Sequence, residues 1–208
     1  MPGTVSEKTI GRLSLYRRLL DNHLDEGKHS VYSHELARLA KVTAAQVRRD
    51  VMGLGYSGSP AHGYDVGELV KCISRLLDPA NRQNVALVGV GNLGRALLAY
   101  FSGRRPNLSV VAAFDSDPVK FNRVINGCMC YPVEQISEIV EKLNIEIGII
   151  AVPASEAQRA AEACVRAGMK GLLNFAPTPL HLPAGVYASD IDLAIALEKV
   201  AFFTRQGR

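Results

Sequence analysis

The segment at residues 85–95, Val-Ala-Leu-Val-Gly-Val-Gly-Asn-Leu-Gly-Arg, is the feature that most restricts the fold of this chain. An apolar run typical of a buried strand leads into Gly89, Gly91 and Gly94, spaced as Gly-x-Gly-x-x-Gly where a helix is expected to begin. The first glycine permits a tight turn, the second lets a phosphate approach the backbone, and the third lets helix and strand pack closely. Because N–H groups at a helix start attract anions, Asn92 and Leu93 join the glycines as predicted cofactor-binding residues.

A second apolar run, residues 110–114, ends at Asp115, 21 residues after Gly94. A carboxylate at this place can accept hydrogen bonds from both hydroxyls of an adenosine ribose. No arginine occurs in the three residues that follow, so we expect NADH and NAD+ as ligands and not their 2′-phosphorylated forms, whose phosphate an aspartate repels. Glycine triplets also occur in ordinary loops, and acids often cap turns. The order of strand, glycines, helix, strand and acid favours a dinucleotide site.

The rest of the second half alternates between helices and strands, as a doubly wound parallel sheet requires. The pattern predicts a helix at 133–143, a strand at 145–152, a helix at 156–167 and a strand at 171–175. Ligands of such sheets lie at the carboxyl ends of the strands. We therefore assign four residues to the nicotinamide half of the site: Val152, Pro153, Asn174 and Phe175.

The first part of the chain predicts short helices. An apolar stripe predicts a helix over 9–26, Ser33 is a suitable N-cap for a second helix, and Thr43 with Gln46 forms a capping box that opens a third. Only two residues separate the second helix from the third cap, which is typical of a helix-turn-helix.

The second helix of such a motif, which is the third helix expected in this chain, enters a major groove, and its first turns reach base edges. Glutamine can pair with adenine, arginine with guanine, and an alanine or threonine methyl can contact thymine. The predicted DNA-binding residues here are Thr43, Ala44, Ala45, Gln46, Arg48 and Arg49. A basic pair can also be an ordinary solvated helix face, but the cap, the tight turn and the basic N-terminal region, with 12 Lys and Arg against 9 Asp and Glu in residues 1–84, favour DNA.

The turn-rich stretch 53–64 predicts a β-hairpin that would be the wing of a winged helix, and His62 near its tip is assigned to DNA binding. A helix over 66–77 follows, and Pro79 marks a domain boundary. The final segment, 190–203, is apolar around nearly its whole circumference and needs burial on several sides, against a second subunit or, alternatively, within its own chain.

The expected fold class is therefore α/β. The predicted organisation is a winged helix-turn-helix DNA-binding domain at 1–80, a Rossmann-type NAD(H)-binding domain with a doubly wound parallel sheet at 81–190, and an apolar C-terminal dimerisation helix at 191–208.

The cysteines and histidines show no spacing typical of metal ligands, so no metal site is predicted. Neither a signal peptide nor an apolar run long enough for a membrane occurs, and we expect a cytoplasmic protein with reduced thiols. Cys128 and Cys130 could form a thiol switch, but alternating residues in an apolar turn favour packing.

Five segments resemble, in the same order, the Rex family of bacterial redox-sensing transcriptional repressors: residues 43–50, 63–66, 87–94, 114–118 and 170–177. The resemblance covers almost all of the chain. It implies a homodimer, joined by a domain-swapped C-terminal helix, that binds a palindromic operator in double-stranded DNA when NADH is low and releases it when NADH rises. It also implies a polar switch made of Arg18, Tyr100 and Asp192, with Asp190 as the rival for the acidic role.

The wing departs from the family pattern. Members carry an aromatic pair after the recognition helix and a lysine or arginine followed by glycine near the wing tip, where this chain has Gly53-Leu54 and Pro60-Ala61-His62. Without a fixed cation, a minor-groove contact is lost and operator affinity is expected to change.

Two other functions fit parts of the sequence, a small NAD-dependent oxidoreductase and a CoA-binding module without DNA binding. A dehydrogenase needs a substrate domain and a placed acid or base, but the chain after Pro177 has room only for a strand and an apolar helix. An acid placed for the ribose, Asp115, favours a dinucleotide over CoA. We therefore expect a repressor without catalytic activity.

Overall fold

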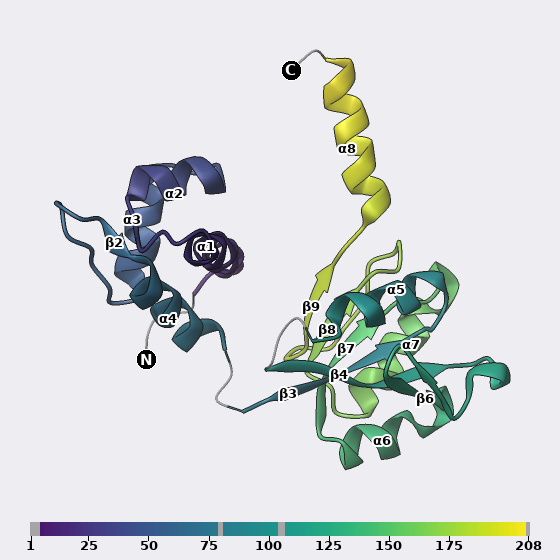
Figure 1. Ribbon diagram of the computed structural model, residues 1–208. Coiled ribbons are helices and arrows are strands. Elements are labelled where there is room, and N and C mark those ends of the chain that lie inside the picture. Colours follow the sequence, from purple (N-terminus) through teal and green to yellow (C-terminus); the bar gives the residue numbers. More distant parts are fainter. Residues whose placement is uncertain (1–4, 79–80, 104–106, 207–208) are drawn as a thin grey trace. The chain divides into compact units, whose positions relative to one another are not determined.

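The computed structural model describes residues 5–78, 81–103 and 107–206 (Figure 1). The chain divides into two units, residues 1–80 and 81–208. The predicted boundary residue Pro79 lies outside the described residues. The predicted α/β class is confirmed, since a helical unit precedes a largely parallel sheet covered by helices. Within the described residues, no helix is both long and apolar enough to cross a membrane.

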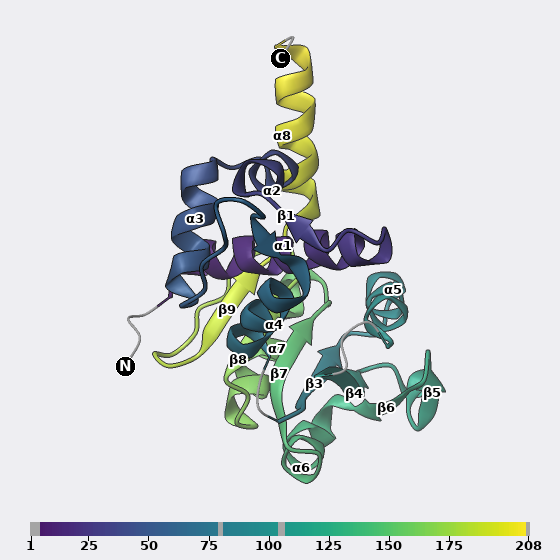
Figure 2. The same ribbon diagram turned by 60° about the vertical axis from the view of Figure 1, so that its left-hand side comes forward.

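The first unit packs helices around one apolar core (Figure 2). Its described elements are α1 (Glu7–Asp25), β1 (Ser30–Val31), α2 (Ser33–Ala40), α3 (Ala44–Gly53), β2 (Tyr64–Asp65) and α4 (Val66–Leu77). The apolar stripe of α1 places Leu13, Tyr16 and Leu20 against the other helices. The predicted helices are confirmed, but the N-cap of α2 is Tyr32 and not Ser33, because the Glu35 carboxylate accepts the Tyr32 backbone N–H at 2.7 Å.

The predicted hairpin over 53–64 is confirmed only around its tip. Gly53 still belongs to α3. The strand β2 does not pair within this stretch but with β1, which precedes α2 and α3 in the sequence. What remains is one bridge, in which Ser59 and Gly63 exchange two backbone hydrogen bonds of 2.8 Å. Glycine and proline are depleted in strands, and this stretch contains four glycines and Pro60, so the described wing is short.

The second unit is a seven-stranded sheet in the order β5-β6-β4-β3-β7-β8-β9, in which only the β5–β6 pair is antiparallel. Its strands are β3 (Gln83–Val88), β4 (Leu108–Asp115), β5 (Arg123–Ile125), β6 (Cys128–Pro132), β7 (Ile145–Ile150), β8 (Gly171–Asn174) and β9 (Tyr187–Asp190). Its helices are α5 (Asn92–Phe101), α6 (Ile136–Lys142), α7 (Ala154–Arg166) and α8 (Leu193–Arg205), with short 3-10 turns η1 (Pro118–Lys120) and η2 (Val133–Gln135).

Helices cover both faces of this sheet. Alternate residues of β3 enter different cores, since Ala86 and Val88 pack in the cluster that includes α6 and α7, whereas Val85 and Leu87 pack with α5. The chain leaves β3 for β4 on one side and returns to β7 on the other. The carboxyl ends of β3 and β7 therefore form the point where strand order reverses, which is where open α/β sheets bind ligands.

Two parts of the second unit differ from expectation. Residues 123–132 form the β5–β6 pair, so Cys128 and Cys130 lie in a strand with buried side chains and not in an apolar turn. At the other end, Asp190 closes β9 and α8 begins only at Leu193, which shortens the helix expected over 190–203 at its start.

Candidate functional sites

The three glycines of the turn after β3 serve different purposes. Gly89 has a φ of 97°, and a Cβ there would lie 2.5 Å from the carbonyl oxygen of Ala151 in the loop after β7. A Cβ on Gly94 would collide with the carbonyl oxygen of Gly89 and would also contact Leu87 of β3. A Cβ on Gly91 would meet nothing within 4 Å. Gly89 and Gly94 are thus required by the protein's own packing, while Gly91 leaves open space in front of the helix.

That open space faces the N-terminus of α5. Gly91 is the N-cap and supplies no side chain, so no side chain caps the first N–H groups of this helix. Asn92 and Leu93 form its exposed first turn. The helix dipole carries about half a positive charge at this end, and uncapped N–H groups beside a glycine suit a pyrophosphate.

Asp115, at the carboxyl end of β4, is 9% exposed and accepts three hydrogen bonds from its own chain. The Val90 N–H donates to Oδ2 at 2.7 Å, the Asp117 N–H to Oδ1 at 2.9 Å, and the Lys120 ammonium to Oδ2 at 3.0 Å. Burial acts to raise the pKa of Asp115, but the hydrogen bonds from Asp117, Val90 and Lys120 outweigh it and hold this pKa below its usual value. The carboxylate therefore ties the glycine turn to the turn after β4.

Asp115 therefore also has a role in the fold, beside the ribose contact that its position predicts. A carboxylate has about four acceptor positions, and three are occupied, so it cannot accept both ribose hydroxyls unless Lys120 moves. Sequence reasoning missed Lys120, because this residue lies five positions after Asp115 and meets it only through a turn of the chain. The pair Asp117-Pro118 could have indicated Lys120, because an N-cap followed by proline begins the short turn η1, which brings the chain back toward β4.

A pocket of about 500 Å³ opens beside these groups. It lies at the carboxyl ends of β3, β4 and β7 and between α6 and α7. Five of the predicted cofactor residues line it: Gly89, Gly91, Asp115, Val152 and Pro153. Its wall also contains Lys120, and apolar side chains that include Phe114 and Ile136. A polar edge beside an apolar cavity suits an adenosine.

Asn174 and Phe175 lie at the carboxyl end of β8 but do not line this pocket. Asn174 is fully buried, and its amide nitrogen donates to the Thr178 carbonyl oxygen at 2.9 Å and to Asp190 Oδ1 at 2.8 Å. Its amide oxygen accepts the Ala176 N–H at 3.0 Å. The side chain thus holds the loop after β8 against the end of β9.

On α3, Thr43 is the N-cap and accepts the Gln46 N–H at 3.1 Å, as the capping pattern predicts. The second half of the predicted box is absent, because the Gln46 side chain donates to Asp50 Oδ1 at 2.8 Å. Ala44 and Gln46 are half-buried, which turns both away from the exposed side of the helix. Of the six predicted DNA-binding residues, these two are therefore the least accessible.

The exposed face of α3 consists of residues spaced at i, i+3, i+4 and i+7: Ala45, Arg48, Arg49 and Met52. Met52, 71% exposed, was missed because it lies at the far end of the helix. Both arginines are exposed, and the Arg48 guanidinium donates to the Ser33 hydroxyl at 3.1 Å, which holds Arg48 against α2. This face presents two cations and one large apolar side chain.

The wing tip is fastened to the first unit's helices. The Tyr32 hydroxyl donates to the carbonyl oxygen of Ala61 at 2.7 Å, and the Tyr32 ring stacks on His34 at 5.6 Å between centroids. A Cβ on Gly63 would lie 2.5 Å from the Val31 carbonyl oxygen, so a glycine is needed there. His62 is exposed beside this anchored turn.

The predicted switch residues lie in both units. Arg18 is exposed on α1, while its neighbour Arg17 is buried and forms an ion pair of 2.6 Å with Asp78. Tyr100 is 52% exposed on α5. Asp192 is the N-cap of α8 and accepts the Ile195 N–H at 2.9 Å. No residue of α8, all of which the structure describes, is buried in the single chain.

Among the described residues, no group of three His, Cys, Asp or Glu side chains could hold a metal ion. The described cysteines are free thiols. Burial raises the pKa of the Cys128 thiol to about 11 and that of Cys164 to about 12.

Comparisons with known proteins agree with the two halves of the chain. Residues 4–51 match the family model "Putative DNA-binding protein N-terminus", and residues 80–178 match the model "CoA binding domain". A relative from Carboxydothermus hydrogenoformans, named redox-sensing transcriptional repressor Rex, is 42% identical over 97% of each chain.

Solved structures of a Rex-family repressor, RSP, have the same fold. The crystal structure of RSP with NAD+ and operator DNA has a TM-score of 0.89 and 32% identity, covering 98% of this chain and 94% of that one. The crystal structure of RSP with NADH has a TM-score of 0.87 and 31% identity, covering 98% and 96%. By the identity and coverage of its relatives, this chain belongs to the Rex family of redox-sensing transcriptional repressors.

Proposed function

We propose that this protein is a homodimeric repressor without catalytic activity that binds a palindromic operator through α3 and senses the NADH/NAD+ ratio at the glycine turn. The observation that carries the proposal is the pairing, in one chain, of an uncapped helix N-terminus beside Asp115 with an exposed basic helix face. The related repressor RSP, solved with NAD+ and operator DNA and with NADH, supports it. A repressor acts where the DNA is, and we place it in the cytoplasm.

For the nucleotide, the first turn of α5 would hold the pyrophosphate and Asp115 one ribose hydroxyl. NADH and NAD+ differ only in the nicotinamide ring, so residues near that ring must discriminate between them. Val152 and Pro153, in the loop after β7, are the candidates for this role, although both also line the pocket beside Asp115. Asn174 would act indirectly, through its hydrogen bonds to the loop after β8.

For DNA, Arg49 is the first candidate for a base contact, because Arg48 is partly engaged by Ser33. An arginine that reads guanine contributes about 1–3 kcal/mol of discrimination. Ala45 lies on the same exposed face and would contact a thymine methyl. His62 would approach the DNA as part of the anchored wing tip.

For the dimer, α8 provides the contact surface. Large apolar side chains are exposed along it: Leu193, Ile195, Leu197, Val200, Phe202 and Phe203. Burial of each such side chain is worth about 1.5–3 kcal/mol, so a partner subunit that covers them would be held firmly. Arg18, Tyr100 and Asp192 of two such subunits would then form the coupling element.

The experiment measures operator binding at fixed salt while nucleotide is added. Duplexes selected from a random pool by the purified protein serve as the probe, and NADH, NAD+ and CoA are titrated separately. We expect NADH to weaken binding and NAD+ to oppose it, because each ligand acts through its different affinity for the two dimer conformations. Arg49→Ala should weaken operator binding at unchanged NADH affinity, whereas Arg75→Ala, an exposed arginine on α4, should leave both unchanged.

Operator binding that does not respond to saturating NADH would refute the sensor function. NADH turnover without any effect on DNA would support the oxidoreductase alternative, and a response to CoA alone would support the CoA-binding module.

A further inference from the structure

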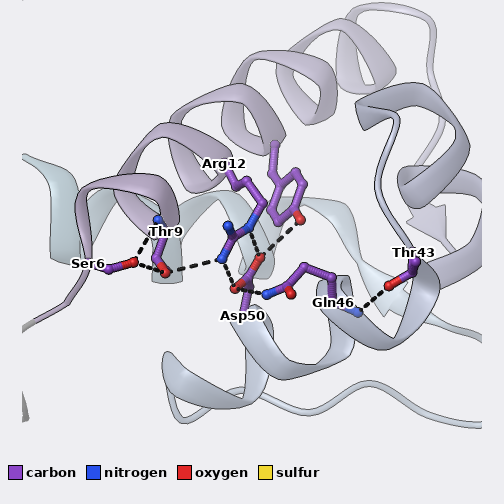
Figure 3. Close-up of polar contacts among 7 residues, drawn as sticks. Ser6, Thr9, Arg12, Thr43, Gln46 and Asp50 are labelled. Atoms are coloured by element: carbon purple, nitrogen blue, oxygen red, sulfur yellow. Dashed lines mark hydrogen bonds and ion pairs between the residues drawn. The ribbon is translucent and has the colours of Figure 1, made fainter.

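A buried carboxylate joins α3 to α1. The Asp50 side chain, 4% exposed, lies on the inner side of α3 and accepts four hydrogen bonds (Figure 3). Arg12 of α1 donates two of them, from Nε at 2.6 Å and from Nη2 at 2.7 Å, while the Tyr16 hydroxyl and the Gln46 amide donate at 3.0 and 2.8 Å. Burial acts to raise the pKa of Asp50, but the hydrogen bonds from Arg12, Gln46 and Tyr16 hold it below its usual value, so the carboxylate is ionised at neutral pH.

The arginine is itself held in place on α1. Its Nη2 also donates to the Thr9 hydroxyl at 3.1 Å, and Thr9 Oγ1 lies 2.9 Å from Oγ of Ser6, the N-cap of α1 (Figure 3). A bidentate pair between a planar guanidinium and a carboxylate fixes direction as well as distance. The contact between Arg12 and Asp50 therefore resists rotation of α3 about its own axis.

Asp50 lies nearly opposite the exposed face of α3. At 100° per residue, it is about 150° around the helix from the centre of the face formed by Ala45, Arg48, Arg49 and Met52. An arginine tip lies at least about 6 Å from the helix axis, so a rotation of 20° would move it about 2 Å or more, beyond the tolerance of a hydrogen bond. A small error in the rotation of α3 would thus remove base contacts while phosphate contacts, which tolerate more displacement, persist.

We propose that the Arg12–Asp50 pair sets the rotation of α3 against α1, and that both are positioning residues for operator recognition. The inference rests on the proposed function, since it assigns the selectivity of the same helix. Buried ion pairs often add little to stability compared with apolar replacements, so stability alone does not explain this pair. If the pair served stability alone, its loss would change thermal unfolding but not the preference for the operator.

The test compares the affinity for the selected operator with that for a scrambled duplex of equal length and composition. Arg12→Lys keeps the cation but removes the two-bond geometry. Arg17→Lys is the matched control, since Arg17 lies on the same helix and pairs at 2.6 Å with Asp78, the C-cap of α4, and not with α3. Tyr16→Phe removes one hydrogen bond to Asp50 and leaves the bidentate pair intact. NADH affinity and thermal unfolding are measured for every variant.

We expect Arg12→Lys to lower the operator-to-scrambled ratio roughly tenfold or more, the range of one or two lost base contacts, at unchanged NADH affinity. Arg17→Lys and Tyr16→Phe should keep the ratio, whatever they do to the melting temperature. If Arg12→Lys is unfolded at the assay temperature, Asp50→Glu carries the test with the same expected loss.

The inference would be overturned if Arg12→Lys kept the wild-type ratio of operator to scrambled affinity, whether its affinity for both duplexes stayed the same or fell equally. An equal loss of ratio in Arg17→Lys would also overturn it, because general loosening of the unit would then explain the result. If the wild-type protein itself selects no duplex, the proposed function fails and this inference fails with it.

Discussion

Replacing Asp115 with asparagine should weaken both the fold of the second unit and the binding of NADH. The amide keeps one acceptor oxygen. In wild-type Asp115, the Val90 N–H and the Lys120 ammonium both donate to Oδ2, and the Asp117 N–H donates to Oδ1. In the variant, the amide oxygen keeps the most donors when it takes the place of Oδ2, and the NH2 group then faces the Asp117 N–H. The partly buried Asp117 N–H loses its charged partner, which costs about 1.5–3 kcal/mol, and the ion pair with Lys120 becomes a contact with a neutral oxygen.

We therefore expect Asp115→Asn to lower the free energy of unfolding without nucleotide by about 2–3 kcal/mol, a large part of the 5–15 kcal/mol typical of a domain. NADH affinity should fall about tenfold or more, because an acceptor for the ribose hydroxyl is lost. Urea unfolding of the nucleotide-free protein and an NADH fluorescence titration measure the two effects. Asp117→Asn is the control, since its side chain is 44% exposed and lies in the same turn.

The same variant tests the acid dependence of stability. Because the pKa of Asp115 is lower in the folded protein than in the unfolded chain, its contribution is present above about pH 4 and is lost as pH falls through the lowered value. Asp115→Asn should therefore show a smaller fall in the free energy of unfolding as the pH is lowered below about 4. Weaker NADH binding with an unchanged free energy of unfolding would refute the role of the three internal hydrogen bonds, and lower stability with wild-type NADH affinity would refute the ribose contact.

Three further results are expected. Cys128 and Cys164 should resist alkylation in the native protein at neutral pH and react on unfolding, because burial raises the pKa of both thiols; rapid native labelling would contradict this. Burial and the hydrogen bond to Asp50 raise the pKa of Tyr16, so its contribution to stability is complete below about pH 10 and is lost as the pH rises toward the raised value. Tyr16→Phe should therefore reduce the fall in melting temperature above about pH 10, and an unchanged fall would contradict this prediction. Asp192→Ala should shrink the NADH effect on operator affinity several-fold, with Asp190→Ala as the comparison; the reverse order would move the switch to Asp190.

Sequence alone determined the features that depend on neighbours in the chain. The turn is predicted by the spacing of its three glycines, Gly89, Gly91 and Gly94. In the structure a Cβ would clash at Gly89 and Gly94, and Gly91 leaves space open in front of α5. The apolar circumference of the last helix likewise predicts that it needs burial on several sides, and the structure leaves the side chains of α8 uncovered in the single chain. Periodicity and glycine spacing are local, so they can be read without a fold.

Only the tertiary structure decided which polar groups are already occupied. Asp115 and Lys120 meet through η1, and Gln46 turns to Asp50 because Arg12 of a distant helix orients that carboxylate. The wing is short for the same kind of reason, since Tyr64 pairs with Val31 and not with its near neighbours in sequence. The free energy of a hydrogen bond depends on partners that burial brings together over long sequence separations, and no local pattern records which of two acceptable partners a side chain will take.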